Sequence, residues 1–122
     1  MKVREAIARL DAARPNAVDT AVKIGWLSTA DHYVKKEIID THEGWENIEF
    51  SGYGTGDLDA ELLVPEPYCE LYVYLMEARM QYDLGDMMRY SNAMSLYNQS
   101  MQEFARWYNA THMPLSVPVI YR

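Results

Sequence analysis

Apolar residues recur every three or four positions over much of the chain, which is the spacing of one face of an α-helix. The first such stretch covers about residues 3–13 and ends before Pro15 and Asn16, which interrupt a helix. A second stretch begins after Asp19, a residue type that favours the N-cap, and reaches about Thr41. The pattern therefore predicts two amphipathic helices in the first third of the chain.

The longest helical pattern lies in the second half of the chain. Apolar and tyrosine residues step by three and four over about residues 67–84, with Pro67 in the first turn, and again over residues 87–112. Gly85 and Asp86 lie between the two stretches and are typical of a helix C-cap followed by an N-cap. The second helix should be on the order of 30 Å long. We therefore expect a long antiparallel helical hairpin across which the first two helices pack.

Residues 43–64 break the helical period. The segment contains four glycines: Gly44, Gly52, Gly54 and Gly56. It is longer than the ~12–15 residues expected of a connection without structure of its own. Ile48 and Phe50 alternate with polar residues, and residues 62–64 supply a candidate second strand. We predict an irregular insertion or a short β-hairpin here.

The last ten residues, 113–122, cannot continue the helix because they contain Pro114 and Pro118. Their apolar residues alternate as in an edge strand, and no partner for this strand is evident elsewhere in the chain. The sequence therefore predicts a mainly α fold, with residues 1–122 as a single small helical bundle that carries the insertion and an extended C-terminal interaction tail.

The charge distribution bears on the class of partner. The chain has 122 residues, 49% of them hydrophobic, so it is long enough to bury a core. Its net charge is −7, and residues 37–70 carry ten acids and no base. A protein that grips nucleic acid by its phosphates needs clustered Lys and Arg, so tight DNA binding is disfavoured. The ten tyrosines suit half-buried, wet contact surfaces and favour an interaction protein.

Compartment and membrane contact are also constrained by the sequence. The single cysteine, Cys69, excludes an intramolecular disulfide. The N-terminal segment lacks the apolar run of a signal peptide, and no stretch approaches the ~20 apolar residues of a membrane span. We expect a protein made and kept in a reducing cytoplasm, without a membrane partner.

Candidate metal sites fail on spacing. Asp40, His42, Glu43 and Glu46 are ligand types, but they form neither Glu-x-x-His nor His-Glu-x-x-His. Residues 57–62 open like a calcium loop, but the sixth position is not glycine and no Glu closes the twelfth. We therefore expect no metal and no cofactor.

Candidate modification and catalytic sites fail on context. Asn109 begins a glycosylation sequon, but within a predicted last helical turn and on a chain not expected to be secreted. His112 is typical of a helix C-terminus, where the dipole favours it. Cys69 falls in a predicted first helical turn, where the dipole could lower its pKa, but no histidine is placed to act as its base. We expect no catalytic residues and no enzyme.

The chain resembles a family of small head-tail connector (adaptor) proteins, encoded in the structural gene cluster of tailed bacteriophages and prophages of Gram-positive bacteria. The stretches that carry the resemblance cover most of the chain: VREAIARLD at 3–11, IGWLS at 24–28, KKEIIDTHEG at 35–44, ELLVPEPYCELYVYLMEA at 61–78, and YSNAMSLYNQSMQEFARWYNATHMP at 90–114. None is a catalytic motif. The chain departs from the family pattern in the acidic loop at 46–59.

The resemblance implies a structural virion protein in the neck of the particle, made in the host cytoplasm. It implies a ring of copies, twelve in number, beneath the portal protein and above a downstream connector or tail protein. DNA passes through such a ring without being tightly bound. Heterologous contacts close a ring only if each subunit presents two different patches.

Two surfaces are assigned on this basis. The acidic residues are expected to face the channel or its rim, where like charge keeps DNA sliding: Glu43, Glu46, Glu49, Asp57, Asp59 and Glu61. The end of the last helix and the tail are expected to contact a neighbouring subunit or the portal, with the tail adding a strand: Trp107, Tyr108, Met113, Leu115, Val117, Val119, Ile120 and Tyr121.

Two rival classes remain open from the sequence. One is a small cytoplasmic helical module that binds or regulates a protein partner, with the seam of the helical hairpin as its groove. The other is a metal-dependent enzyme.

Overall fold

The structure is a computed structural model that describes residues 1–115; Val117, Val119, Ile120 and Tyr121 of the expected interface lie outside the described residues. Within residues 1–115 it has four α-helices: α1 (Val3–Ala13), α2 (Thr20–Glu37), α3 (Leu71–Asp83) and α4 (Met87–Thr111). Two 3₁₀ helices, η1 (Ile39–Thr41) and η2 (Trp45–Asn47), follow α2. The predicted mainly α fold is confirmed.

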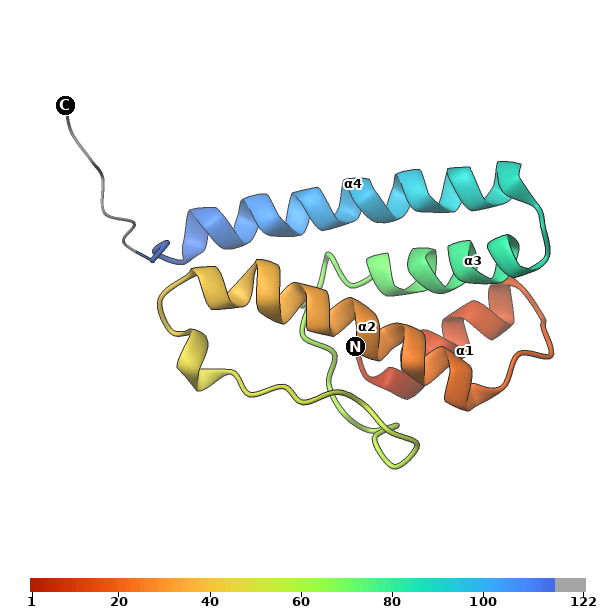
Figure 1. The fold of residues 1–122 in the computed structure, drawn as a ribbon, viewed down its shortest axis with the longest axis horizontal. Helices are drawn as coiled ribbons and strands as arrows, with labels where there is room; N and C mark the ends of the chain where they lie inside the picture. The colour runs from red at the N-terminus through yellow and green to blue at the C-terminus, as the bar shows by residue number, and fades with distance from the viewer. Residues whose placement is uncertain (116–122) are drawn as a thin grey trace.

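Helix α3 is the centre of the bundle. Figure 1 shows α3 and α4 antiparallel and side by side, and α3 also packs against α1 and α2. Because three helices surround it, α3 buries residues on most of its faces rather than along one stripe. All four helices contribute to one core, whose fully buried side chains include Leu10, Leu27, Val34, Leu71, Met76 and Phe104.

The turn between α3 and α4 has the predicted geometry. Gly85 adopts a left-handed backbone with φ of 77°. Its N–H donates to Tyr82 O at 3.1 Å, and the N–H of Asp86 donates to Gln81 O at 2.9 Å, which is the hydrogen-bond pattern of a Schellman C-cap. The Asp86 side chain then accepts from the Arg89 N–H and caps α4. The helical hairpin is therefore confirmed at its tip.

The start of the hairpin differs from the prediction. Helix α3 begins at Leu71 instead of residue 67. Residues 66–70 form successive turns, and the peptide bond between Glu66 and Pro67 is cis. The N–H groups of Leu71 and Tyr72 bond three residues back, to Tyr68 O and Cys69 O, so the backbone there is tighter than an α-helix. The expectation that Pro67 occupies the first helical turn is wrong.

The β-hairpin alternative for residues 43–64 is wrong, and the irregular alternative holds. The residues expected to form its second strand bond elsewhere: the N–H of Leu62 donates to Met1 O, that of Leu63 to Asp31, and that of Val64 to the Tyr72 hydroxyl. No strand ladder forms within 43–64, because partners far along the chain use these backbone donors.

The first residues of the tail have a partner in their own chain, contrary to the expectation. The N–H of Glu43 donates to Met113 O at 2.8 Å, and the N–H of Leu115 donates to Thr41 O at 3.0 Å. These two bonds form an isolated antiparallel bridge between His42 and Pro114. Residues 113–115 are therefore held beside η1.

Gly85→Ala should lower the free energy of unfolding by about 1 kcal/mol, because a Cβ disfavours the left-handed backbone. Gly25→Ala is the matched control: the site lies inside α2, nothing stands within 4 Å of the added carbon, and alanine should stabilise the helix by about 0.5–1 kcal/mol. Urea denaturation measures both. Equal effects of the two substitutions would contradict the assigned turn.

Candidate functional site

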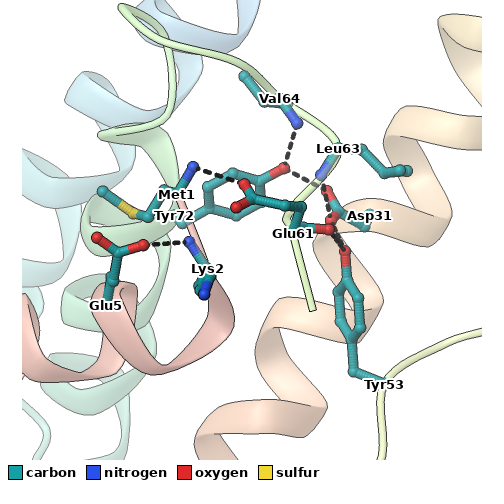
Figure 2. A network of polar contacts seen from close by, with 9 residues as sticks. All are labelled: Met1, Lys2, Glu5, Asp31, Tyr53, Glu61, Leu63, Val64 and Tyr72. Carbon is teal, nitrogen blue, oxygen red and sulfur yellow. Dashed lines mark hydrogen bonds and ion pairs between the residues drawn. The ribbon is translucent and has the colours of Figure 1, made fainter. Parts of the chain in front are cut away.

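A buried junction around Asp31 ties the insertion to the helices. Asp31 lies in the middle of α2 and is fully buried. It accepts hydrogen bonds from the hydroxyls of Tyr53 and Tyr72, both at 2.5 Å, and from the N–H of Leu63 at 3.0 Å. The Tyr72 hydroxyl itself accepts from the Val64 N–H at 2.8 Å. Figure 2 shows the two tyrosine hydroxyls and the Leu63 amide converging on this carboxylate, with the Val64 amide directed at the Tyr72 hydroxyl.

The electrostatics of the junction favour a structural role. Burial raises the pKa of Asp31, while the hydrogen bonds from Tyr53, Tyr72 and Leu63 act in the opposite direction. Burial, together with the neighbouring Asp31 charge, raises the pKa of both tyrosines, so their hydroxyls stay protonated and donate. A carboxylate enclosed by three donors joins segments; it is not exposed to a substrate.

A further set of contacts ties the same loop to α2. The N–H of Tyr53 donates to Ser28 Oγ at 3.1 Å, and Phe50 packs edge-on against the rings of His32 and Tyr53. Gly52 has a φ of 106°, and a Cβ there would come within 3.1 Å of Ser28 Oγ, so this position favours glycine. The glycine-containing stretch therefore allows close approach to α2.

The six acidic residues separate into two groups. Asp59 pairs with Arg4 at 2.7 Å, Glu61 pairs with the terminal ammonium of Met1 at 3.2 Å, and Asp57 accepts from the Gly54 N–H at 2.7 Å. The Arg4 hydrogen bond lowers the pKa of Asp59. These three acids, although exposed, are held by the N-terminal region and by their own turn.

The other three acids, which we call the acidic end, lie around η2: Glu43, Glu46 and Glu49. All are exposed, and in the part of the chain that the structure describes no Lys or Arg lies within ion-pair distance of them. Between them, Trp45 is half-exposed; its carbonyl accepts from Lys35 Nζ at 3.0 Å, and the same ammonium lies 5.4 Å from its ring centre. The acidic end is therefore a fixed, negatively charged surface with one aromatic side chain.

The predicted interface residues that the structure describes differ in exposure. Trp107, Met113 and Leu115 are exposed, whereas Tyr108 is buried in the chain's own core. The Tyr108 ring stacks on His112 with centroids 3.8 Å apart. The three exposed residues form what we call the C-terminal patch.

A buried histidine, which sequence reasoning treated only as a possible ligand, fixes this end of the molecule. His42 Nδ1 lies 2.6 Å from Ile38 O, and Nε2 lies 2.6 Å from Asn109 Oδ1. The sequon asparagine is therefore part of a clamp that joins the end of α2 to the end of α4. Over residues 1–115, no three His, Cys, Asp or Glu side chains are grouped to hold a metal ion.

Cys69 does not lie in a helical first turn. It precedes α3 and is fully buried. Burial raises the pKa of its thiol, and the neighbouring Glu66 raises it further, so the thiol is kept protonated.

The opposite end of the molecule carries a second apolar surface. The tip of the α3–α4 hairpin exposes four large side chains, which we call the hairpin tip: Tyr82, Leu84, Met87 and Met88. Figure 1 places this tip at the far end of the molecule from η2 and the end of α4. Leu84 is 76% exposed and Met88 77%, values typical of side chains with no packing partner in their own chain. Among the helices of residues 1–115, none is long and apolar enough to span a membrane.

No family model matches this chain, and neither a curated protein nor a solved structure shows a significant match. The resemblance to head-tail connectors therefore stays a prediction from the sequence.

Tyr72→Phe should lower the free energy of unfolding by about 2–3 kcal/mol, because it leaves the buried Val64 N–H without an acceptor and removes a donor from Asp31. Tyr53→Phe also removes a donor from Asp31, but it leaves no buried amide without an acceptor. It should therefore lower the free energy of unfolding by about 1 kcal/mol less than Tyr72→Phe does. Chemical denaturation gives both values.

Tyr33→Phe is the control, since Tyr33 is half-exposed on the same helix as Asp31 and should change stability by less than about 0.5 kcal/mol. If Tyr72→Phe proved as mild as this control, the junction would not hold the insertion.

Proposed function

We propose that the protein is a structural subunit of a bacteriophage head-tail connector. In this role copies form a ring beneath the portal, joining capsid to tail around a channel for DNA. The observation that carries the proposal is the presence of two different exposed apolar surfaces, the hairpin tip and the C-terminal patch, at opposite ends of one helical body. A ring subunit that also docks on the portal must present one surface to its neighbour and a different one to the portal.

The chemistry of these surfaces suits protein contacts. Methionine and aromatic side chains adapt to irregular partners and are enriched at interfaces. Met87 and Met88 at the tip, and Trp107 and Met113 at the other end, are of this kind. An isolated soluble subunit gains nothing from exposing them, whereas a subunit that assembles buries them.

Rigidity between the two ends also supports a ring. Ring closure requires a fixed rotation from one copy to the next. The Asp31 junction holds the insertion against α2 and α3, and the His42–Asn109 contact joins the ends of α2 and α4. Movement of one end relative to the other would break these hydrogen bonds.

The charge pattern supports a channel that releases DNA. The exposed acids of the insertion would repel a phosphate backbone, and no compensating cluster of lysines lies in residues 37–70. We place the acidic insertion at the channel or its rim. DNA then passes without being tightly bound.

Leu84→Ser combined with Met88→Ser should abolish ring formation on the portal protein encoded in the same gene cluster, because the substitutions remove the exposed apolar side chains of the hairpin tip. The wild-type chain, mixed with that portal, should form rings visible by electron microscopy, with about twelve copies by mass. Tyr33→Ser, at a comparably exposed position in the middle of α2, is the control and should assemble normally. A wild-type chain that stays monomeric or dimeric with the portal present would favour a helical binding module instead.

Removal of residues 116–122 should leave a folded protein, because the backbone hydrogen bonds of Glu43 and Leu115 and all four helices are retained. We expect the truncated chain to lose portal binding, since the tail is proposed to add a strand to that partner. Portal capture and the thermal unfolding curve are the two measurements. If the truncated chain bound the portal as well as the wild-type chain does, the tail would not be the portal contact.

A further inference from the structure

An apolar groove lies beside the hairpin tip, between α1, α3 and α4. It has a volume of about 380 Å³, and its apolar walls come from all three helices: Leu10, Ala13, Val73, Ala93 and Leu96. Leu96 is 46% exposed, so the groove opens to the surface. A groove of this size takes a large apolar side chain with part of its backbone.

Two arginines border this groove and keep hydrogen-bond donors to spare. Arg14 and Arg89 line it, and their side chains are 53% and 59% exposed. Arg14 donates through Nε to Glu77 at 2.8 Å, and the carboxylate of Asp86 lies 3.5 Å from Arg89. A guanidinium carries five N–H donors, so both side chains can still bind a carboxylate on an incoming partner.

The groove also contains an acceptor without a donor. Glu77 Oε1 accepts hydrogen bonds from Arg14 and, at 3.4 Å, from Gln81. Glu77 Oε2 is buried and accepts no hydrogen bond from the residues that the structure describes. An unsatisfied buried acceptor is costly, by about 1–3 kcal/mol. An occupant that brings an N–H donor, after rotation of the carboxylate, would recover part of this cost.

The acidic end offers opposite charge and one exposed aromatic side chain. Trp45 is half-exposed, and Lys35 holds it through its carbonyl and ring. Its indole carries one N–H donor and no acceptor. Glu46 and Glu49 line the same surface depression as Trp45, together with Lys35, Ile48 and Phe50, so two acids face one base there. Tryptophan is among the residues that most often dominate binding energy at interfaces.

We propose that η2 of one copy docks into the groove between α1, α3 and α4 of the next copy. Trp45 then lies between the apolar walls, Glu46 lies at Arg89, and Glu49 lies at Arg14. Figure 1 shows η2 and the hairpin tip at opposite ends of the molecule, so a chain cannot fill its own groove. A second copy, arranged head to tail, can supply this occupant, because its η2 carries the exposed Trp45 together with Glu46 and Glu49. This inference rests on the proposed ring and names its contact.

The contact divides the acidic residues between two roles. Glu46 and Glu49 lie in the seam between copies. Glu43, Asp57, Asp59 and Glu61 stay on the channel or its rim. The C-terminal patch remains free for the portal, so the ring contact and the axial contact use different surfaces.

The test is a pair of charge reversals in the full chain. Glu46→Arg places a base on η2, so its docking against Arg89 is repulsive. Arg89→Glu places an acid in the groove, where it repels the natural η2; glutamate is tolerated at this position because it lies in the first turn of α4. Each variant alone should lose head-to-tail self-association by about 100-fold, measured by sedimentation.

Mixing the two variants in equal amounts should restore assembly. The basic η2 of the first variant fits the acidic groove of the second, and the acidic η2 of the second fits the natural groove of the first, so copies alternate. Arg79→Glu, at an exposed position of α3 outside this groove, is the control and should associate like wild type.

The outcomes separate this inference from the proposed function. Variants that each assemble like wild type, or a mixture that does not recover, would overturn the contact while leaving a ring on the portal intact. Rescue by mixing without any binding to portal would support the contact and overturn the connector role. If the groove binds an unrelated protein instead, mixing the two variants should not restore assembly, which would overturn the contact.

Discussion

The fold depends on the burial of one carboxylate. Asp31 is removed from water in the middle of α2, and such a group is stable only when donors surround it. Those donors come from Tyr53, Leu63 and Tyr72, which lie 22, 32 and 41 residues further along the chain. One buried acid therefore fixes the insertion over α2 and α3, and it sets where the acidic end lies relative to the helical hairpin.

The helices could be predicted because their determinants are local. Apolar spacing placed α1 and α4 closely, and Gly85 with Asp86 specified the turn between α3 and α4. The insertion could not be predicted, since its backbone donors are satisfied by Met1, Asp31 and Tyr72 rather than by neighbours. One signal was available: Asp31 is an acid beside Ala30 and between the buried positions of Leu27 and Val34, so it lies on a face that had to be packed.

The candidate surfaces were predicted in part. A run of acids in the sequence does not reveal which acids are paired, and only the fold brings Arg4 to Asp59 and leaves Glu46 open. His42 and Asn109 are 67 residues apart, and only the fold brings the residue after η1 against the end of α4. The groove with Arg14 and Arg89 is formed by residues of three helices, so no local sequence pattern predicts it.

The central claim is that copies of this chain join head to tail through η2 and the groove. Disulfide capture between two variants, each with one added cysteine, tests it most directly: Glu46→Cys on η2 and Asn92→Cys in the groove wall, both at exposed positions, with the native Cys69 buried. After mild oxidation, intact-mass measurement should find a covalent dimer formed mainly in the mixture of the two variants. Dimers that form equally well in each variant alone, or no dimer in the mixture, would contradict the account.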